Sequence, residues 1–370
     1  MKWIILLLLA PFHWGLGLKQ GDIKGVNFFG LETPLANTDC SWHAPASFYI
    51  EELARRGFNW IRLPFSGEYV RNSNFKVMDE IFSACNRHGI SISLDWHRNN
   101  NAFQDNFLEN ISFDEYIRTY KQVINRYYFN PTLKMVGLFN EYKGTDSQYW
   151  QQMMEKALTE IETAYPGRFF YMVGCVQWSG NCRDMDWSHL PYTERVFYDI
   201  HKYPFSGSSN VADWESSFPK NKTQCVVGEW GFFREQSEWA NRFVEWLNQQ
   251  GIHNNFFWQA TQNSDDTGGL YHNDCRDFEE DKFQIIQRLW KPDHRQMYSP
   301  LPYPNNGCWK KLNNTEPEDD WEDDEDDRRN LQGGWRQRKC SNFNDDEVRC
   351  ERKRHCCYRH MDDICFRCVE

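Results

Sequence analysis

The sequence lacks an excess of basic residues. Its 42 Lys and Arg are outnumbered by 53 Asp and Glu, which gives a formal net charge of −11. Proteins that bind nucleic acid hold the phosphates on a basic surface, so this balance argues against a nucleic-acid partner. Apolar residues are not scarce, because 40% of the chain is hydrophobic and 16% is aromatic. This composition excludes a disordered chain.

Long apolar runs are also missing. After residue 17, no segment approaches the ~20 apolar residues that a membrane-spanning helix needs. At the start of the chain, Met1 and Lys2 precede an apolar run at residues 3–10, and Gly15 and Gly17 follow it. A basic head, an apolar stretch and a small-residue exit are typical of a cleaved secretory signal peptide. We therefore expect residues 1–17 to be a signal peptide and the mature protein to be secreted, extracellular and without a membrane contact. An uncleaved membrane anchor is the alternative.

Cysteines and glycosylation sequons agree with secretion. The chain holds 13 Cys, a number that suits an oxidising compartment. Three N-glycosylation sequons occur, at Asn110, Asn221 and Asn313. Seven Cys lie from Cys40 to Cys308. They could form three disulfides and leave one thiol, or one could pair with another chain. Cys175 and Cys182 are close enough in sequence to bridge each other.

Between residues 18 and 312, short β-rich segments alternate with amphipathic helical patterns. The β-rich segments are residues 23–28, 58–63, 90–96, 135–139, 169–173, 196–200, 225–228 and 255–258. The helical patterns include residues 46–56, 75–88, 113–128, 148–165 and 236–250. This alternation predicts a parallel sheet closed into a (β/α)8 TIM barrel, which usually takes ~250 residues. An open doubly wound sheet is the alternative, but the Gly-rich phosphate turn typical of that fold is missing after the first segment.

The composition changes after residue 312. Ten of the twelve residues 316–327 are Asp or Glu. Like charges in a run repel one another, so residues 313–335 are expected to be an acidic linker rather than a calcium or partner site. Residues 336–370 hold six Cys and almost no aliphatic core. We expect them to form a small Cys-rich module stabilised by disulfides, with a zinc cluster as the alternative.

Polar or aromatic side chains close most of the predicted strands. They are Arg62 on the second strand, His97 on the third, Asn140 and Glu141 on the fourth, His201 and Tyr203 on the sixth, Glu229 on the seventh and Trp258 on the eighth. The active site of a TIM barrel lies at the carboxyl ends of its strands. Any one of these residues could be a helix cap or a solvated side chain. Together they predict a site in which Glu141 and Glu229 face each other, as cleavage of a glycosidic bond requires.

In this order and spacing, these residues resemble the family 5 glycoside hydrolases, and among them the secreted endo-β-1,4-glucanases. The resemblance runs from about residue 25 to residue 272, and every position that marks the family has a match in the set just given. Residues 25–33 (GVNFFGLET) look like the first-strand segment of bacterial cellulases, and residues 263–269 (NSDDTGG) look like their final loop. Tyr142 follows Glu141 where Pro is frequent, a departure that concerns the leaving-group subsites rather than the reaction.

The resemblance implies a retaining hydrolase that needs no metal and no organic cofactor. Glu229 would be the nucleophile, and Arg62 and Tyr203 would stabilise its negative charge. Glu141 would be the general acid and base. The two carboxyl groups should lie ~5–5.5 Å apart, the separation at which a covalent glycosyl-enzyme forms.

The same resemblance assigns the remaining residues to the substrate. Asn140 would contact the 2-hydroxyl of the sugar bound to the nucleophile, while His97 and His201 would orient hydroxyls and the acid/base carboxylate. Trp258 would offer its flat face to a pyranose ring. Two further tryptophans are candidates for outer subsites, with packing in the core as the alternative. They are Trp42 and Trp178.

The expected substrate is cellulose or a related β-glucan, cleaved at internal β-1,4 bonds. The same chemistry on β-mannan, xyloglucan or β-1,3-glucan is the alternative, because subsite loops decide the substrate. A carbohydrate-binding protein that has lost turnover is a third possibility, although no catalytic position is missing. We expect the protein to act as a monomer.

Overall fold

The computed structural model describes residues 17–33, 36–72, 75–97, 111–204, 210–262 and 267–290, together with the backbone of two short strands near the carboxyl terminus. The predicted linker, most of the Cys-rich module and the signal peptide up to residue 16 lie outside these residues, as do Asn110 and Asn313. The chain divides into two compact units, Met1–Pro300 and Leu301–Glu370. In the second unit, β9 (Cys356–Arg359) and β10 (Ile364–Arg367) pair as an antiparallel sheet.

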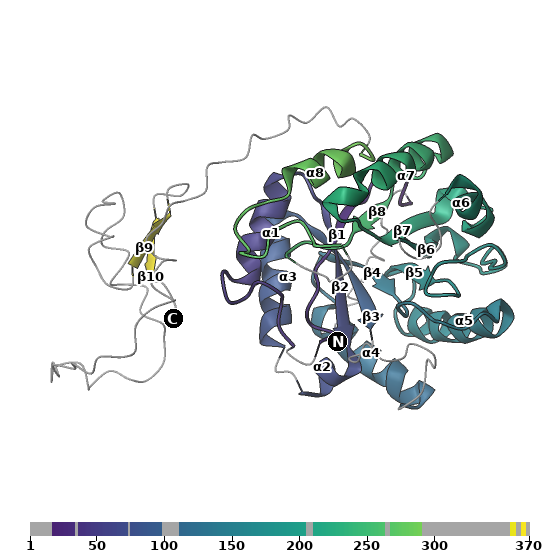
Figure 1. Cartoon of the computed structure of the whole chain (residues 1–370). Coiled ribbons are helices and arrows are strands. Elements are labelled where there is room, and N and C mark those ends of the chain that lie inside the picture. The colour runs from purple at the N-terminus through teal and green to yellow at the C-terminus, as the bar shows by residue number, and fades with distance from the viewer. Residues whose placement is uncertain are drawn as a thin grey trace, which may run out of the picture. The chain divides into compact units, whose positions relative to one another are not determined.

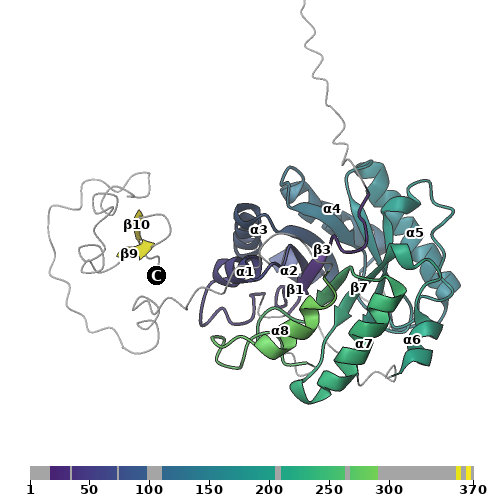
Figure 2. The same ribbon diagram turned by 90° about the horizontal axis from the view of Figure 1, so that it is seen from above.

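Eight parallel strands close into a barrel in chain order (Figures 1 and 2). They are β1 (Lys24–Asn27), β2 (Trp60–Ser66), β3 (Ser91–His97), β4 (Leu133–Gly137), β5 (Phe170–Gly174), β6 (Val196–Lys202), β7 (Cys225–Trp230) and β8 (Asn255–Phe257). Because β1 pairs with both β2 and β8, the sheet has no free edge. The predicted barrel is confirmed, and the open sheet is excluded.

Helices surround the barrel in both views (Figures 1 and 2). They are α1 (Ala46–Arg55), α2 (Gly67–Asn72), α3 (Lys76–His88), α4 (Phe113–Tyr127), α5 (Ser147–Ala164), α6 (Val211–Ser217), α7 (Ser237–Gln250) and α8 (Glu280–Gln287), with 3-10 turns η1 (Thr193–Arg195), η2 (Lys222–Gln224) and η3 (Arg234–Gln236). All five helical patterns named from the sequence are present. In the described part of the chain, no helix is long and apolar enough to cross a membrane.

Side chains of the outer helices hold the strand ends that carry the site. Tyr116 and Tyr120 of α4 donate hydroxyl hydrogen bonds to the carbonyls of Leu138 and Gly137, at 2.5 and 2.6 Å. Both tyrosines are fully buried. The segment that follows β4 is therefore held by hydrogen bonds from a helix outside the barrel. The carboxyl ends of the strands, which this segment approaches, are called the mouth below.

Two disulfides form among the described cysteines. Cys175 and Cys182 are bonded, as their spacing suggested, and Cys40 is bonded to Cys275. Cys85 and Cys225 are buried free thiols. Among the six described cysteines between residues 40 and 308, two disulfides form and the barrel buries Cys85 and Cys225 as free thiols, while Cys308 lies outside the described residues. The Cys40–Cys275 bond ties the segment after β1 to the segment after β8.

Candidate active site

Contacts link the eight predicted site residues at the mouth, but four of them are placed on the strands differently from expectation. Arg62 does not end its strand, since β2 continues to Ser66. Asn140 and Glu141 lie beyond the end of β4 at Gly137, and Trp258 follows β8. For Arg62 the cause is the pleat of a buried parallel strand, whose side chains alternate between the inside of the barrel and the surrounding helices. A polar residue that lies several positions before the end of its strand can therefore point into the barrel and reach the site.

Arg62 is the centre of the site and is fully buried. One guanidinium nitrogen donates to Glu229 Oε1 at 2.6 Å and to Asn27 Oδ1 at 2.9 Å. The other donates to Asp95 Oδ2 at 2.9 Å and to Asn140 Oδ1 at 2.8 Å. Burial alone would lower the pKa of Arg62, but the charges of Asp95 and Glu229 raise it above the ordinary value. This side chain is a permanent cation that fixes four neighbours at once.

The carboxylate of Glu229 is held at both oxygens. Arg62 binds Oε1, and the hydroxyl of Tyr203 donates to Oε2 at 2.9 Å. His201 Nδ1 lies 3.5 Å from the same Oε2. Glu229 is 4% exposed, so a buried carboxylate faces the mouth in one fixed orientation. Arg62 and Tyr203 therefore hold both oxygens of this carboxylate in place.

Glu141 faces Glu229 across the mouth. One oxygen of each carboxylate and a ring nitrogen of His201 lie within 4.8 Å of one another. His201 Nδ1 is 2.9 Å from Glu141 Oε1, and the opposite nitrogen of the ring is 3.3 Å from Asp199 Oδ1. Glu141 has a φ of 51°, in the left-handed region that non-glycine residues rarely adopt. Such strain concentrates at functional positions.

His201 carries a positive charge through neutral pH. Burial would lower its pKa, but the charges of Glu229 and Asp199 and the hydrogen bonds to Asp199 and Glu141 raise it to about 10. The protonated ring presents Nδ1–H to Glu141. Asp199 is 1% exposed and also lies 3.6 Å from the Arg62 guanidinium. It therefore connects the two cations of the site.

His97 and Trp258 line another part of the mouth. His97 Nε2 lies 2.8 Å from Asp95 Oδ2, and its ring is stacked on Trp258 with centroids 6.3 Å apart and an interplanar angle of 14°. Phe29 meets the same Trp258 edge to face at 5.7 Å. Trp258 is 7% exposed, so its surroundings cover most of its surface.

Trp42 and Trp178 do not pack in the core. They are 54% and 50% exposed, so the packing alternative is wrong for both. Trp42 lies in the segment after β1, and Trp178 lies in the segment after β5 with a φ of 55°. Lys143 lies over the Trp178 ring at 5.9 Å. Both indoles thus have an open surface on loops that follow barrel strands.

Three polar residues of the site were not among those predicted from the sequence. They are Asn27, Asp95 and Asp199. Asp95 lies two residues before His97 in β3, and Asp199 lies two residues before His201 in β6. Alternate residues of a strand share a face, so the spacing already placed each aspartate beside its histidine. Positions two residues before each predicted histidine therefore indicate Asp95 and Asp199, whereas no such signal points to Asn27.

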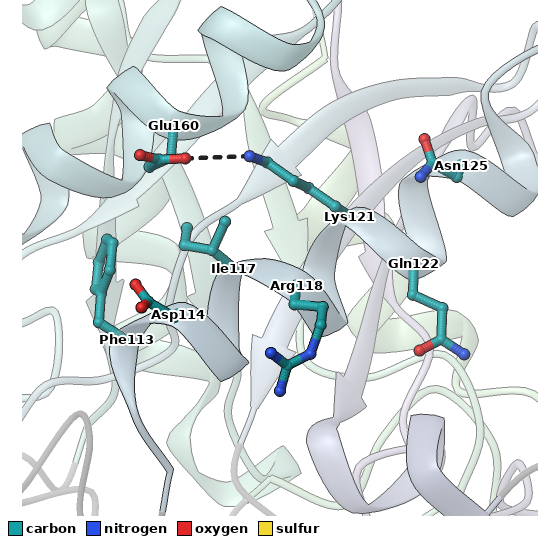
Figure 3. A pocket seen from close by; sticks show the side chains of 8 residues that line it. All are labelled: Phe113, Asp114, Ile117, Arg118, Lys121, Gln122, Asn125 and Glu160. Atoms are coloured by element: carbon teal, nitrogen blue, oxygen red, sulfur yellow. Dashed lines mark hydrogen bonds and ion pairs between the residues drawn. The ribbon is translucent and has the colours of Figure 1, made fainter.

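Glu141, His201 and Glu229 are the described residues whose donor atoms are close enough to hold a metal ion. Their atoms already bind one another and Arg62 and Tyr203, so the set is satisfied as a hydrogen-bonded network. A separate pocket lies on the outside of the barrel, along α4 and beside α5 (Figure 3). Lys121 and Glu160 pair across it at 3.1 Å, and no predicted site residue lines it.

Comparisons with known proteins agree with this geometry. A sequence model of the family described as Cellulase (glycosyl hydrolase family 5) matches residues 20–264. The chain is 25% identical to an endoglucanase of Paenibacillus polymyxa, over 74% of this chain and 84% of that protein. It is 24% identical to the major extracellular endoglucanase of Xanthomonas campestris, over 74% of this chain and 68% of that protein. The solved catalytic domain of the Xanthomonas campestris major endoglucanase shares the fold, with a TM-score of 0.63 at 24% identity over 72% of this chain and 94% of that chain.

Proposed function

The chain belongs to glycosyl hydrolase family 5, the cellulase family, and is a cellulase-like glycoside hydrolase; from this premise we propose that it cleaves internal β-1,4-glucosidic bonds of cellulose or a related β-glucan outside the cell. The proposal extends to the mechanism, which is a double displacement with retention of anomeric configuration. Its substrate preference is inferred from the endoglucanases that the chain resembles.

The observation that carries the mechanism is the separation of the two glutamates. Their nearest oxygens lie within 4.8 Å of each other. Retaining glycosidases place their carboxyl groups ~5–5.5 Å apart, whereas inverting enzymes leave ~6.5–9.5 Å for a water molecule. The short gap supports direct attack by a carboxylate on the anomeric carbon.

The reaction then takes two steps. In the first, Glu229 attacks the anomeric carbon while Glu141 donates its proton to the oxygen of the departing sugar, so that the glycosidic bond breaks and a glycosyl ester forms. In the second, Glu141 removes a proton from water, the water oxygen bonds to the anomeric carbon, and Glu229 leaves as a carboxylate. Arg62 and Tyr203 stabilise that carboxylate before and after the ester exists.

The neighbours of this pair orient the substrate and the acid. The amide of Asn140 is oriented by its bond from Arg62 and is proposed to donate through Nδ2 to the 2-hydroxyl of the sugar. His201 donates Nδ1–H to Glu141 and sets the position of that carboxyl. His97 is the proposed contact for a second hydroxyl. The buried carboxylate of Asp95 holds the His97 ring in place, so the ring loses little conformational entropy when it binds substrate.

Aromatic rings extend the site along the chain of the polysaccharide. Trp258 is the proposed platform beside the reacting sugar, and Trp42 and Trp178 are the proposed outer subsites. The exposed faces of Trp42 and Trp178 suit the apolar face of a pyranose ring, because an indole buries a large apolar surface while its N–H stays available for polar contact.

The test combines catalysis with stereochemistry. Glu229→Gln and Glu141→Gln should each reduce hydrolysis of carboxymethylcellulose by several orders of magnitude while thermal unfolding changes little. Glu80→Gln is the control, since Glu80 accepts a hydrogen bond from the backbone amide of Ser47 and belongs to α3 on the outer ring, away from the candidate site. The wild type should act on carboxymethylcellulose in preference to mannan, xyloglucan and laminarin.

Proton NMR of the first products separates the two mechanisms. The β-anomer should appear first and then mutarotate. An α-anomer as the first product would refute double displacement. If the enzyme prefers another polymer of the panel, the proposed substrate is wrong, whereas the proposed mechanism is unaffected.

A further inference from the structure

A buried carboxyl near the mouth has no role in the proposed reaction. Glu32, in the segment after β1, is 5% exposed. Its Oε2 accepts a hydrogen bond from the backbone amide of Gly30 at 2.8 Å. Its Oε1 is buried and has no hydrogen-bond partner among the described residues. Leaving a buried polar atom unpaired destabilises the folded protein, and more so when the group is charged, so this oxygen needs a physical explanation.

Holding the local turn does not require the second oxygen. Gly30 has a φ of 135°, and its carbonyl accepts bonds from the amide of Thr33 at 3.2 Å and from the Thr33 hydroxyl at 2.8 Å. Together with the Oε2 bond, these contacts close the turn. The turn therefore uses one oxygen of Glu32 and fixes where the other one lies.

Electrostatics connect Glu32 to the site. Burial raises its pKa, the charge of His97 opposes that rise, and the charge of Glu229 adds to it. The charges of His97 and Glu229 therefore act on the carboxyl group of Glu32. Phe29, in the same segment, packs against Trp258, and His97 stacks on that indole. The segment after β1 therefore borders the mouth beside His97.

We propose that Glu32 is a further substrate-binding residue, whose Oε1 makes a hydrogen bond to a hydroxyl of the sugar that lies against His97. This inference rests on the proposed function, because it assumes a β-linked glucan in the mouth. A sugar hydroxyl supplies the partner that Oε1 lacks, and burial of the carboxyl strengthens the bond by excluding water. A ligand without that hydroxyl would leave the oxygen unpaired and would bind more weakly.

The experiment measures kcat and KM on cellopentaose for Glu32→Ala, Glu32→Gln and Thr33→Val. Glu32→Ala removes the proposed contact and should lower kcat/KM roughly 10–100-fold, the range for one hydrogen bond to a charged group. Glu32→Gln keeps an oxygen for the Gly30 amide and keeps a polar group at the Oε1 position, so it should recover part of that loss. Thr33→Val loosens the same turn but leaves the carboxyl in place, and its kcat/KM should stay within about threefold of the wild type.

Two results would overturn the inference. One is a Glu32→Ala enzyme with the kcat/KM of the wild type. The other is a loss in Thr33→Val equal to that in Glu32→Ala, since the turn and not the carboxyl would then be responsible. If Glu32→Ala does not fold, a Glu32→Gln enzyme identical to the wild type in kcat/KM would have the same force. A wild type that does not cleave cellopentaose would instead contradict the proposed function, so the two failures are distinct.

Discussion

Replacing Arg62 with Met should lower the free energy of unfolding by about 3–5 kcal/mol at pH 7, the usual cost of removing one partner from a buried ion pair. Arg62 is 0% exposed, and its carboxylate partners Asp95, Asp199 and Glu229 are at most 5% exposed at the side chain. Without the guanidinium, these three carboxylates would share His201 as their nearby cation. Methionine fills a similar volume, so the loss reports the missing charge rather than a cavity.

The pH dependence identifies the cause. Burial would raise the pKa of Asp95, yet the charge of Arg62 holds it below its ordinary value of 3.8. In the wild type, this stabilisation is present above about pH 4 and is lost as the pH falls through the lower folded pKa. In Arg62→Met, the charge of Arg62 no longer opposes burial and only His97 and His201 still do, so Asp95 takes up a proton more readily. The variant should therefore recover stability relative to the wild type as the pH falls from 7 to 4.

Urea unfolding followed by tryptophan fluorescence at pH 4 and pH 7 measures both effects. Arg55→Met is the matched control: Arg55 pairs with Glu51 and Glu52, but its side chain is 27% exposed. Surface pairs contribute about 0–1 kcal/mol, so this variant should lose no more than that at either pH. The reasoning is refuted if Arg62→Met loses no more than Arg55→Met, or if its loss is the same at both pH values.

Three further changes test other parts of the structure. Cys40→Ser opens the bond to Cys275, which spans a sequence separation of 235 residues, and should cost about 2–5 kcal/mol of stability. Thermal unfolding of the variant and the wild type, with and without a reductant, would measure this loss. Equal melting temperatures for the two proteins without reductant would contradict it. Glu32→Gln should gain melting temperature relative to the wild type between pH 4.5 and 7, because burial raises the pKa of Glu32 above 4.5 and ionisation then costs the wild type stability; a constant difference would argue against this. If Asn221 is glycosylated, enzymatic removal of the glycan should lower the mass without changing kcat/KM, since Asn221 caps η2 just before β7, at the end of the barrel opposite to the mouth.

Most of the barrel could be predicted because its strands are buried and apolar. All seven residues of β2 and all seven of β3 are buried, so the runs stand out from the amphipathic helices between them. The helices α2, α6 and α8 were not predicted, because six, seven and eight residues are too few to repeat an amphipathic pattern several times. The order of strands then followed from the alternation alone.

The residues that bear on catalysis were harder to predict than the fold. Polar residues at the strand ends, such as His97 and His201, could be predicted from the sequence. Asp95 and Asp199 were not predicted, although each lies two residues before one of these histidines on the same face of its strand. The Cys40–Cys275 bond depends on closure of the barrel, which brings the segments after β1 and β8 together. Periodicity along the chain carries no information about that contact.

Asp95 and Asp199 explain how the site can tolerate the proposed covalent intermediate. When Glu229 becomes an ester, it loses its negative charge, and a buried Arg62 paired with it alone would be left as an uncompensated cation. Asp95 at 2.9 Å and Asp199 at 3.6 Å still face the guanidinium, and Asp199 also faces His201. In the proposed cycle, Arg62 and His201 therefore still have carboxylate partners when Glu229 is an ester. The proposed nucleophile can change its charge because the cations around it are balanced by Asp95 and Asp199.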